Sequence, residues 1–320
     1  MRLDTTPPTS FTWPDIPYTA WRDTCAALHL YLQIVGKYRL SRTPWVNHSW
    51  HATFYVNARG LTTSQIVDGP GGAIEIEFDL IDHVVIGMGA DGRTERFALD
   101  SMSVADFLFR FLDLIRALGG TAELHGRPNE IADAKPFAED RQQRPYDRDA
   151  VTRFHQALIQ VDRVLKQFRT SCFGKVSPVH LFWGSFDLAV TRFSGRIAPL
   201  HPGGVPALPD EVTREAYSHE VSSAGFWPGG GGVDYPAFYS YAYPAPEGFS
   251  QARVEPEAAF YSPELGEFLL PYDAVRLASD PDAALSAFLE STYVAAAKLG
   301  HWDRGALECS PGRPRQPRPI

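Results

Sequence analysis

Apolar side chains recur every three or four residues in four stretches of the chain, which is the spacing of one face of an α-helix. The first stretch predicts a helix that begins after the capping residue Thr19 and ends at Gly36. Three more helices are predicted to begin after Ser103, Asp147 and Asp280, whose side chains suit an N-cap. Each of these helices needs a surface on which to bury its apolar face.

Between the helices, apolar and polar residues alternate, which predicts β-strands. The first half of the chain shows a principal strand over 50–59, followed by antiparallel strands over 73–80, 84–88 and 94–99. The second half shows a principal strand over 180–192, followed by strands over 237–243, 257–261 and 267–270. The predicted fold class is therefore α+β, with two similar halves, each an antiparallel sheet with long helices packed on it.

The similar order of elements in the two halves suggests an internal duplication. Adding 132 to the numbers of the first principal strand carries Trp50 to Phe182 and Phe54 to Phe186. A generic layout shared by two α+β units explains the similarity equally well. If a duplication did occur, the second half carries an insertion over 196–235, and insertions on a repeated scaffold are common places for function.

Proline, glycine and charged residues divide the chain into five parts. In order, we expect an extended lead-in (1–18), a first α+β half (19–125), a connector (126–146), a second α+β half (147–309) and a disordered tail (310–320).

The second principal strand has two chemically different faces. Its even-numbered residues, from His180 to Arg192, form a largely apolar face that should meet the core. The opposite face carries Trp183, Ser185 and Asp187 and suits a solvent cleft or a ligand wall. A bulge at Gly184 would exchange the two faces on one side of it.

Composition limits the classes of partner. The chain has 44% hydrophobic and 21% charged residues, which is ordinary for a globular protein. Its net charge of −8 argues against binding to duplex nucleic acid. No apolar run approaches the roughly 20 residues of a membrane span, no signal peptide is evident, and the three cysteines suit reduced thiols. We therefore expect a soluble, cytoplasmic protein with no nucleic-acid or membrane partner.

Candidate catalytic residues gather between 179 and 229. Asp187 or Glu220 is the candidate base, and His219 the candidate acid or metal ligand. The tryptophans of this region would stack against a substrate, and tyrosine hydroxyls would orient it. The candidate substrate-binding residues are Trp183, Arg192, Trp227, Tyr239, Tyr241 and His51. An ion pair between Asp187 and Arg192 at sheet edges is the simpler explanation for either residue taken alone.

Histidines raise the question of a metal site. Five of them could supply ligands for a divalent ion, namely His48, His51, His180, His201 and His219. Their spacing matches no metal-binding motif, and a buried histidine bonded to a backbone carbonyl is the more frequent situation. We assign no metal ligand from the sequence, and the cofactor stays unknown.

Two functions follow from these residues, and the sequence does not fix whether the protein is an enzyme. The first is a small-molecule enzyme whose cleft in the second half is lined by aromatic, histidine and carboxylate side chains. The alternative is a non-catalytic ligand-binding or oligomeric scaffold protein that uses the aromatic face of Tyr239, Tyr241 and Tyr243 as an interface, for example in a homodimer. An exposed flat patch would favour the interface, and a concave site the enzyme.

Several runs of residues together resemble a bacterial family of uncharacterised proteins about 300 residues long. They are HLFWGSFDLAVTRFSG, AYSHEVSSAGFWPG, FYSYAYP, GEFLLPYDAVR and, in the first half, NHSWHATFYVNARGLTTS. The resemblance extends from about Trp13 to Glu308. It implies a bacterial cytosolic protein of a family defined only as a domain of unknown function, and it carries no catalytic residue over to this chain.

Overall fold

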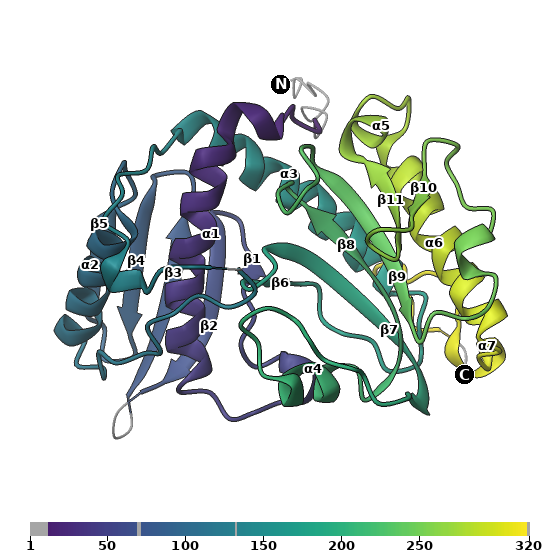
Figure 1. Ribbon diagram of the computed structural model, residues 1–320, viewed down its shortest axis with the longest axis horizontal. Coiled ribbons are helices and arrows are strands. Elements are labelled where there is room, and N and C mark those ends of the chain that lie inside the picture. Colours follow the sequence, from purple (N-terminus) through teal and green to yellow (C-terminus); the bar gives the residue numbers. More distant parts are fainter. Residues whose placement is uncertain (1–11, 69–71, 132, 319–320) are drawn as a thin grey trace, which may run out of the picture.

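The computed structural model describes residues 12–68, 72–131 and 133–318. Two antiparallel sheets, one of five strands and one of six, lie side by side with helices packed against them (Figure 1). The fold class is α+β, as the sequence predicts. The described helices are α1 (Tyr18–Leu40), α2 (Val104–Ala117), α3 (Arg148–Arg169), α4 (Asp210–Ala216), α5 (Tyr272–Arg276), α6 (Pro281–Leu299) and α7 (Arg304–Leu307), with 3-10 turns η1 (Asn47–Ser49), η2 (Phe137–Glu139) and η3 (Phe249–Gln251).

The strands of the first sheet follow one another in chain order, and those of the second sheet almost do. The first sheet contains β1 (Tyr55–Val56), β2 (Gly60–Val67), β3 (Ala73–Asp79), β4 (Val84–Gly89) and β5 (Thr94–Ala98). The second has the order β10-β11-β9-β8-β7-β6. Its strands are β6 (His180–Phe182), β7 (Asp187–Ile197), β8 (His219–Trp227), β9 (Ala237–Tyr243), β10 (Phe260–Ser262) and β11 (Glu267–Pro271).

Three helices begin where their capping residues predict. Ser103 forms a capping box with Asp106, and the side chains of Asp147 and Asp280 accept hydrogen bonds from the backbone of the first turn. The predicted end of α1 at Gly36 is wrong. A Cβ at this position would lie 2.4 Å from the Trp183 ring, so the glycine allows a close approach and α1 continues to Leu40.

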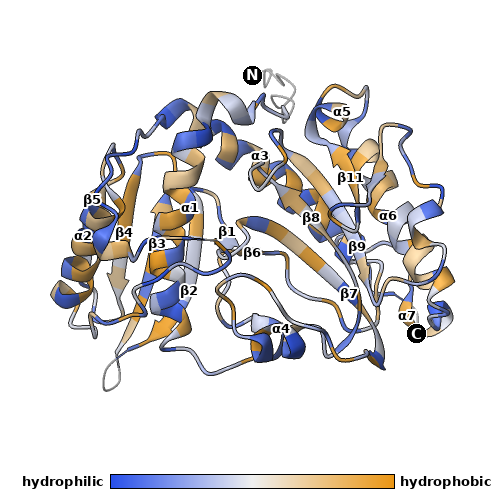
Figure 2. Ribbon diagram, in the orientation of Figure 1, coloured by the Kyte–Doolittle hydropathy of each residue, from blue (hydrophilic) through white to orange (hydrophobic). Residues whose placement is uncertain are grey.

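Aromatic side chains fix α1 and α2 on the first sheet. Tyr31 and Tyr38 of α1 contact Phe107 and Phe111 of α2, and Phe107 stacks on Phe78 of β3 at 6.0 Å. Figure 2 shows hydrophobic residues along these strands and helices, whereas α4 is hydrophilic. Burying this apolar surface is what holds the helices on the sheet.

On the second sheet, α3 and α6 cover one face. There Arg192 of β7 lies between two aromatic rings, 3.5 Å from the centroid of Phe168 on α3 and 4.3 Å from that of Tyr293 on α6. Among the described residues, no long helix covers the other face of this sheet, which is turned toward the middle of the molecule (Figure 1).

The two sheets meet at their edges. Phe54, just before β1, exchanges both backbone hydrogen bonds with Leu181 of β6, at 2.9 and 2.8 Å. This antiparallel bridge connects residues 127 positions apart. Each half of the chain therefore pairs with the edge of the other half's sheet.

Both predicted principal strands need correction. Residues 47–53 form η1 and a turn, so the strand predicted over 50–59 is reduced to Phe54 and the short β1, and β2 was not predicted. The strand predicted over 180–192 is a hairpin, β6 and β7, that turns at 183–186. Adding 132 to β1 gives 187–188, which lies on β7 rather than β6, so the proposed alignment of the halves fails in detail. The duplication is not confirmed.

The domain boundaries stay a prediction, and most of the lead-in, residues 1–11, lies outside the described residues. The described part of the tail is not free. The Gly312 N–H donates to the Thr170 hydroxyl at 2.8 Å, and Arg318 donates to the carbonyls of Ser310 and Thr170. None of the helices in the described part of the chain is long and apolar enough to cross a membrane.

Candidate functional site

The uncovered face of the second sheet is polar because period-two alternation places hydroxyls and a carboxylate on it. Strand register brings Thr191 of β7, Ser223 of β8, Tyr241 of β9 and Glu267 of β11 into one row across the sheet. The hydroxyls of Thr191 and Ser223 lie 2.9 Å apart. This row is the floor of the candidate site.

Asp187, at the start of β7, lies beside this row and is 7% exposed. Its carboxylate accepts hydrogen bonds from the Tyr239 and Ser185 hydroxyls. Gly225 makes the first of these contacts feasible, since a Cβ there would lie 2.5 Å from the Tyr239 hydroxyl oxygen. Gly225 therefore provides the space through which the tyrosine reaches the carboxylate.

Two charged residues approach the same place from the first half of the chain. Glu130 lies in the loop before η2. A Cβ on Gly184 would lie only 1.9 Å from its Oε1. Lys37 of α1 is 4% exposed and donates to Asn129 Oδ1 at 2.6 Å. The charges of Lys37 and Glu130 stabilise each other.

Burial shifts the pKa values of these groups in the direction that favours their uncharged forms. It raises the pKa of Glu130 to about 7, with a further rise from the Asp187 charge and an opposing effect of Lys37. Burial and Asp187 likewise raise the pKa of Glu267 to about 7. The pKa of Asp187 itself is raised by burial, against the hydrogen bonds from Ser185 and Tyr239. Burial lowers the pKa of Lys37 to about 8.

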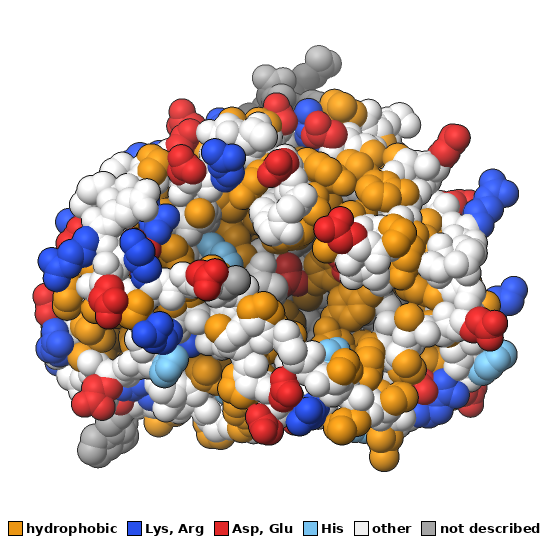
Figure 3. All heavy atoms as spheres, in the orientation of Figure 1, with side chains coloured by type: hydrophobic (Ala, Val, Ile, Leu, Met, Phe, Trp, Pro, Cys, Tyr) orange, Lys and Arg blue, Asp and Glu red, His pale blue; other side chains and the backbone are white. Residues whose placement is uncertain are grey.

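Tyrosines complete the set, which we call the carboxyl–tyrosine cluster. The Tyr217 and Tyr241 hydroxyls lie 2.9 Å apart, and the rings of Tyr239 and Tyr241 stack at 6.1 Å. The cluster consists of Lys37, Glu130, Asp187, Tyr217, Tyr239, Tyr241 and Glu267. Figure 3 shows a hollow in the middle of this face of the molecule, with acidic side-chain atoms visible deep inside it.

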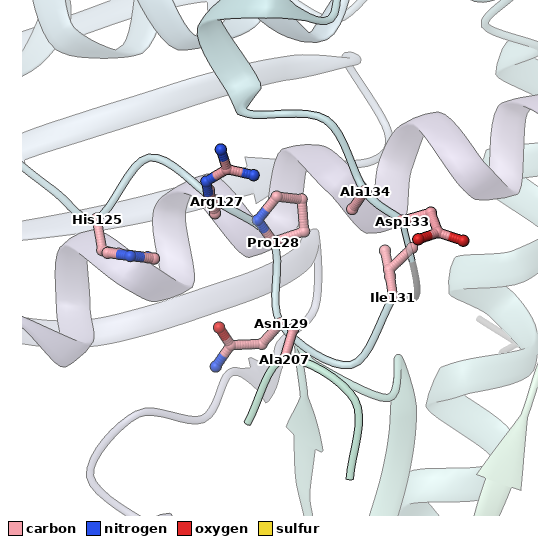
Figure 4. Close-up of a pocket in the computed structure, with 8 residues that line it drawn as sticks. All are labelled: His125, Arg127, Pro128, Asn129, Ile131, Asp133, Ala134 and Ala207. Atoms are coloured by element: carbon pink, nitrogen blue, oxygen red, sulfur yellow. The ribbon is translucent and has the colours of Figure 1, made fainter. Parts of the chain in front are cut away.

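A pocket of about 390 Å³ lies beside the cluster, between Ala207 and residues of 125–131 and 133–134 (Figure 4). His125 and Arg127 line one side of it and Asp133 the other. Asn129 also lines this pocket and accepts the hydrogen bond from Lys37, so the pocket wall is connected to the cluster.

The structure brings three of the predicted site residues together, Asp187, Tyr239 and Tyr241. Trp227 of β8 lies on the same face as Asp187. It lies opposite Asp187 in the strand register, next to the Leu188–Phe226 pair. Trp183 is buried against α1, and its indole N–H donates to the Ala52 carbonyl at 2.7 Å. Its ring therefore supports the hairpin rather than forming an open stacking wall.

His219 and Glu220 are not brought to Asp187. His219 begins β8, eight residues before Trp227, which is a separation of about 26 Å along an extended strand. Glu220 points to the opposite face and forms an ion pair with Arg196 at 2.7 Å. The geometry does not support acid–base catalysis in which Asp187, His219 and Glu220 act together.

Arg192 and His51 also lie apart from the cluster. Arg192 is 1% exposed on the helix-covered face, where it donates to the Phe168 carbonyl and to Ser171 Oγ at 2.8 Å. It is not paired with Asp187. The His51 ring lies near Trp45, at 4.7 Å between centroids, and its Nδ1 lies 3.2 Å from the Val46 backbone N–H that donates to it.

The histidines considered for a metal do not form one group. The His48 ring is 6.1 Å from that of His219, but its Nδ1 bonds to the Ala216 carbonyl at 2.7 Å and its Nε2 accepts from Lys175 at 2.6 Å. His201 stacks on Tyr217 at 4.7 Å. Among the described residues, no three His, Cys, Asp or Glu side chains are placed to hold a metal ion.

A protein-family model matches residues 13–309, which is nearly the whole chain. The chain belongs to DUF5996, a family of unknown function. This confirms the family resemblance seen in the sequence motifs. Searches of curated proteins and of solved structures gave no significant match to this DUF5996 chain.

Sequence reasoning missed Lys37, Glu130, Tyr217 and Glu267. Lys37 lies one residue beyond Gly36, where the predicted helix ended, so the sequence pattern assigned it to no helical face. Glu267 lies on β11 next to buried residues, but the alternation along the strand points its side chain to the uncovered face of the sheet. Glu130 lies in a loop with no periodic pattern, so only the fold of the DUF5996 chain reveals its place beside Gly184.

Proposed function

We propose that the carboxyl–tyrosine cluster is the active site of an enzyme that moves protons on a small molecule. The observation that carries the proposal is the gathering of the Asp187, Glu130 and Glu267 carboxyl groups with tyrosine hydroxyls on the uncovered face of the sheet, where Asp187 accepts from Tyr239 and its charge acts on both glutamates. Burial and this charge raise the pKa of both glutamates to about 7. A carboxyl group with such a pKa gives or takes a proton efficiently at neutral pH. Perturbed groups gathered in a concave site are typical of active sites.

The contacts suggest a division of roles. Glu130 and Glu267 are the candidates for general acid and general base. Asp187, fixed by Tyr239 and Ser185, would orient the substrate, and its charge helps to raise the pKa of both glutamates. The Tyr217 and Tyr241 hydroxyls would bind polar groups of the substrate.

Charge limits the substrate. Among the ion pairs of the described residues, none includes Asp187, Glu130 or Glu267, and Lys37 is the one basic group that acts on Glu130. The site therefore favours a neutral or cationic small molecule over an anion. Tyr239 is buried and Tyr241 half-buried, which is not the exposed flat patch that an interface would need.

The test is an untargeted turnover assay. The protein is incubated with a cell metabolite extract at pH 7, and mass spectrometry follows compounds that disappear and appear. We expect at least one conversion with the wild type and with Glu264→Gln, a control on the exposed turn before β11. Asp187→Asn and Glu267→Gln should lose it while keeping their circular dichroism spectra. Conversion that survives in both variants, or that never occurs, would contradict the proposal.

The pH profile gives a second readout. If both glutamates take part, the rate on an identified substrate should be bell-shaped with its limbs near pH 7. A compound that stabilises the wild type but is never converted would mark the cluster as a binding site without catalysis.

A further inference from the structure

A second polar site lies where the two sheets meet. Arg39, near the C-terminal end of α1, is 6% exposed. Among the described residues it takes part in no ion pair, and its Nε and Nη1 have no hydrogen-bond partner. A buried guanidinium without a counter-charge is costly, so most such groups are paired.

Two histidines with unpaired ring nitrogens lie near this arginine. His180 of β6 is fully buried, and neither of its ring nitrogens has a partner among the described residues. His51, in the turn after η1, is 6% exposed and leaves its Nε2 unpaired. Buried polar nitrogens without partners are few in folded proteins, and here they come from three separate segments.

Contacts with Tyr55 and Thr43 bring these groups together. The Arg39 guanidinium lies 5.7 Å from the centroid of the Tyr55 ring, and the His180 ring lies 6.5 Å from the same ring. The Thr43 hydroxyl donates to the backbone carbonyls of both Arg39 and His51, at 2.7 and 3.3 Å. The Arg39 charge contributes to lowering the pKa values of both His180 and His51, after burial, which places both imidazoles within its reach. The Glu215 charge opposes this effect on His51 but is weaker than that of Arg39, so the net charge around the three groups is positive.

We propose that Arg39, His51 and His180 bind a small inorganic anion of about the size of chloride. The unpaired N–H groups of Arg39 and an N–H of each imidazole are the donors such an ion accepts. The rings of Trp50, Tyr55 and Phe182 lie around His180, which favours a small ion over a bulky organic acid. The bound ion would connect α1 of the first half to β6 of the second, next to the Phe54–Leu181 bridge.

Ordered water is the competing occupant, because water also pairs buried polar atoms. The two differ in their dependence on salt. An anion that binds only the folded protein increases the folded-to-unfolded ratio in proportion to its concentration once it exceeds the Kd. Water gives no such dependence.

The experiment replaces sodium gluconate by sodium chloride at constant ionic strength and measures urea denaturation. For the wild type we expect the folded-to-unfolded ratio to rise up to tenfold for each tenfold increase in chloride above the Kd. Arg22→Met, which removes an exposed arginine of the same helix, should follow the wild type. Arg39→Met should show no chloride dependence, and His51→Gln should need more chloride for the same effect.

Crystals soaked in sodium bromide give an independent measurement that uses the wild type alone. The expected result is an anomalous difference peak in contact with the Arg39 guanidinium. A wild-type stability independent of chloride, together with no bromide peak at Arg39, overturns the proposal and leaves water as the occupant. Equal chloride dependence in Arg39→Met and the wild type overturns it as well.

Discussion

Replacing Glu267 by glutamine should stabilise the protein at alkaline pH and leave its stability unchanged in acid. The ordinary pKa of a glutamate is 4.5, and burial with the nearby Asp187 charge raises that of Glu267 to about 7. The folded protein therefore holds this proton over a wider pH range than the unfolded chain. Its contribution is fully present below pH 4.5, is lost as the pH rises toward 7, and stays lost above that.

The size of the effect follows from the two pKa values. At 1.36 kcal/mol for each pKa unit, the difference between 4.5 and about 7 corresponds to about 3 kcal/mol. Glutamine is neutral at every pH and nearly the same shape, so it avoids this cost. We expect Glu267→Gln to exceed the wild type in free energy of unfolding by up to about 3 kcal/mol at pH 8.5, and to match it at pH 4.

Urea denaturation followed by tryptophan fluorescence at pH 4, 5.5, 7 and 8.5 measures this difference. Glu264→Gln is the matched control, because that carboxylate is exposed on the turn before β11 and should show no such gain. Parallel pH curves for the wild type and Glu267→Gln would refute the reasoning, since they would mean that Glu267 titrates alike in the folded and unfolded chain.

Three further substitutions test the packing around the site by chemical denaturation. Gly225→Ala should cost about 3 kcal/mol, because its Cβ would lie 2.4 Å from the Leu188 carbonyl oxygen and 2.5 Å from the Tyr239 hydroxyl oxygen; a loss below about 1 kcal/mol would contradict this close approach. Arg192→Met should cost about 3 kcal/mol by removing the hydrogen bonds of the buried guanidinium to the Phe168 carbonyl and Ser171 Oγ and its ion pair with Glu290; a loss below about 1 kcal/mol would argue against its structural role. Ser103→Ala should cost about 1 kcal/mol by removing the α2 cap, with no effect on substrate turnover.

Much of the fold could be predicted because its signals are local. Capping residues and helical spacing place α2, α3 and α6, and alternation places β3, β4 and β9. The prediction failed where tertiary contacts override the pattern. Residues 50–59 alternate as a strand does, but only Phe54 and the short β1 pair with other strands, and a turn occupies 50–52. This turn follows η1, in which His48 and Ser49 adopt positive φ values of 62° and 58°.

The candidate site was predicted only in part, for a related reason. The polar face of β7 and the tyrosines of β9 follow from alternation, and strand pairing then brings Asp187 to Tyr239. Lys37 and Glu130 join them from a distant helix and a loop, and no sequence pattern specifies that meeting. The sequence proximity of His219 and Glu220 was misleading, because neighbouring residues on a strand point to opposite faces.

The bridge between Phe54 and Leu181 has a consequence for biosynthesis. Leu181 leaves the ribosome 127 residues after Phe54, a delay of about 6–25 s at the usual rates of synthesis. During that interval the backbone edge at Phe54 has no strand to pair with, and the Trp183 ring that packs against Gly36 has not yet been synthesised. A nascent chain with such an open edge can pair with another copy, so the first half depends on the timely arrival of the β6–β7 hairpin to avoid aggregation.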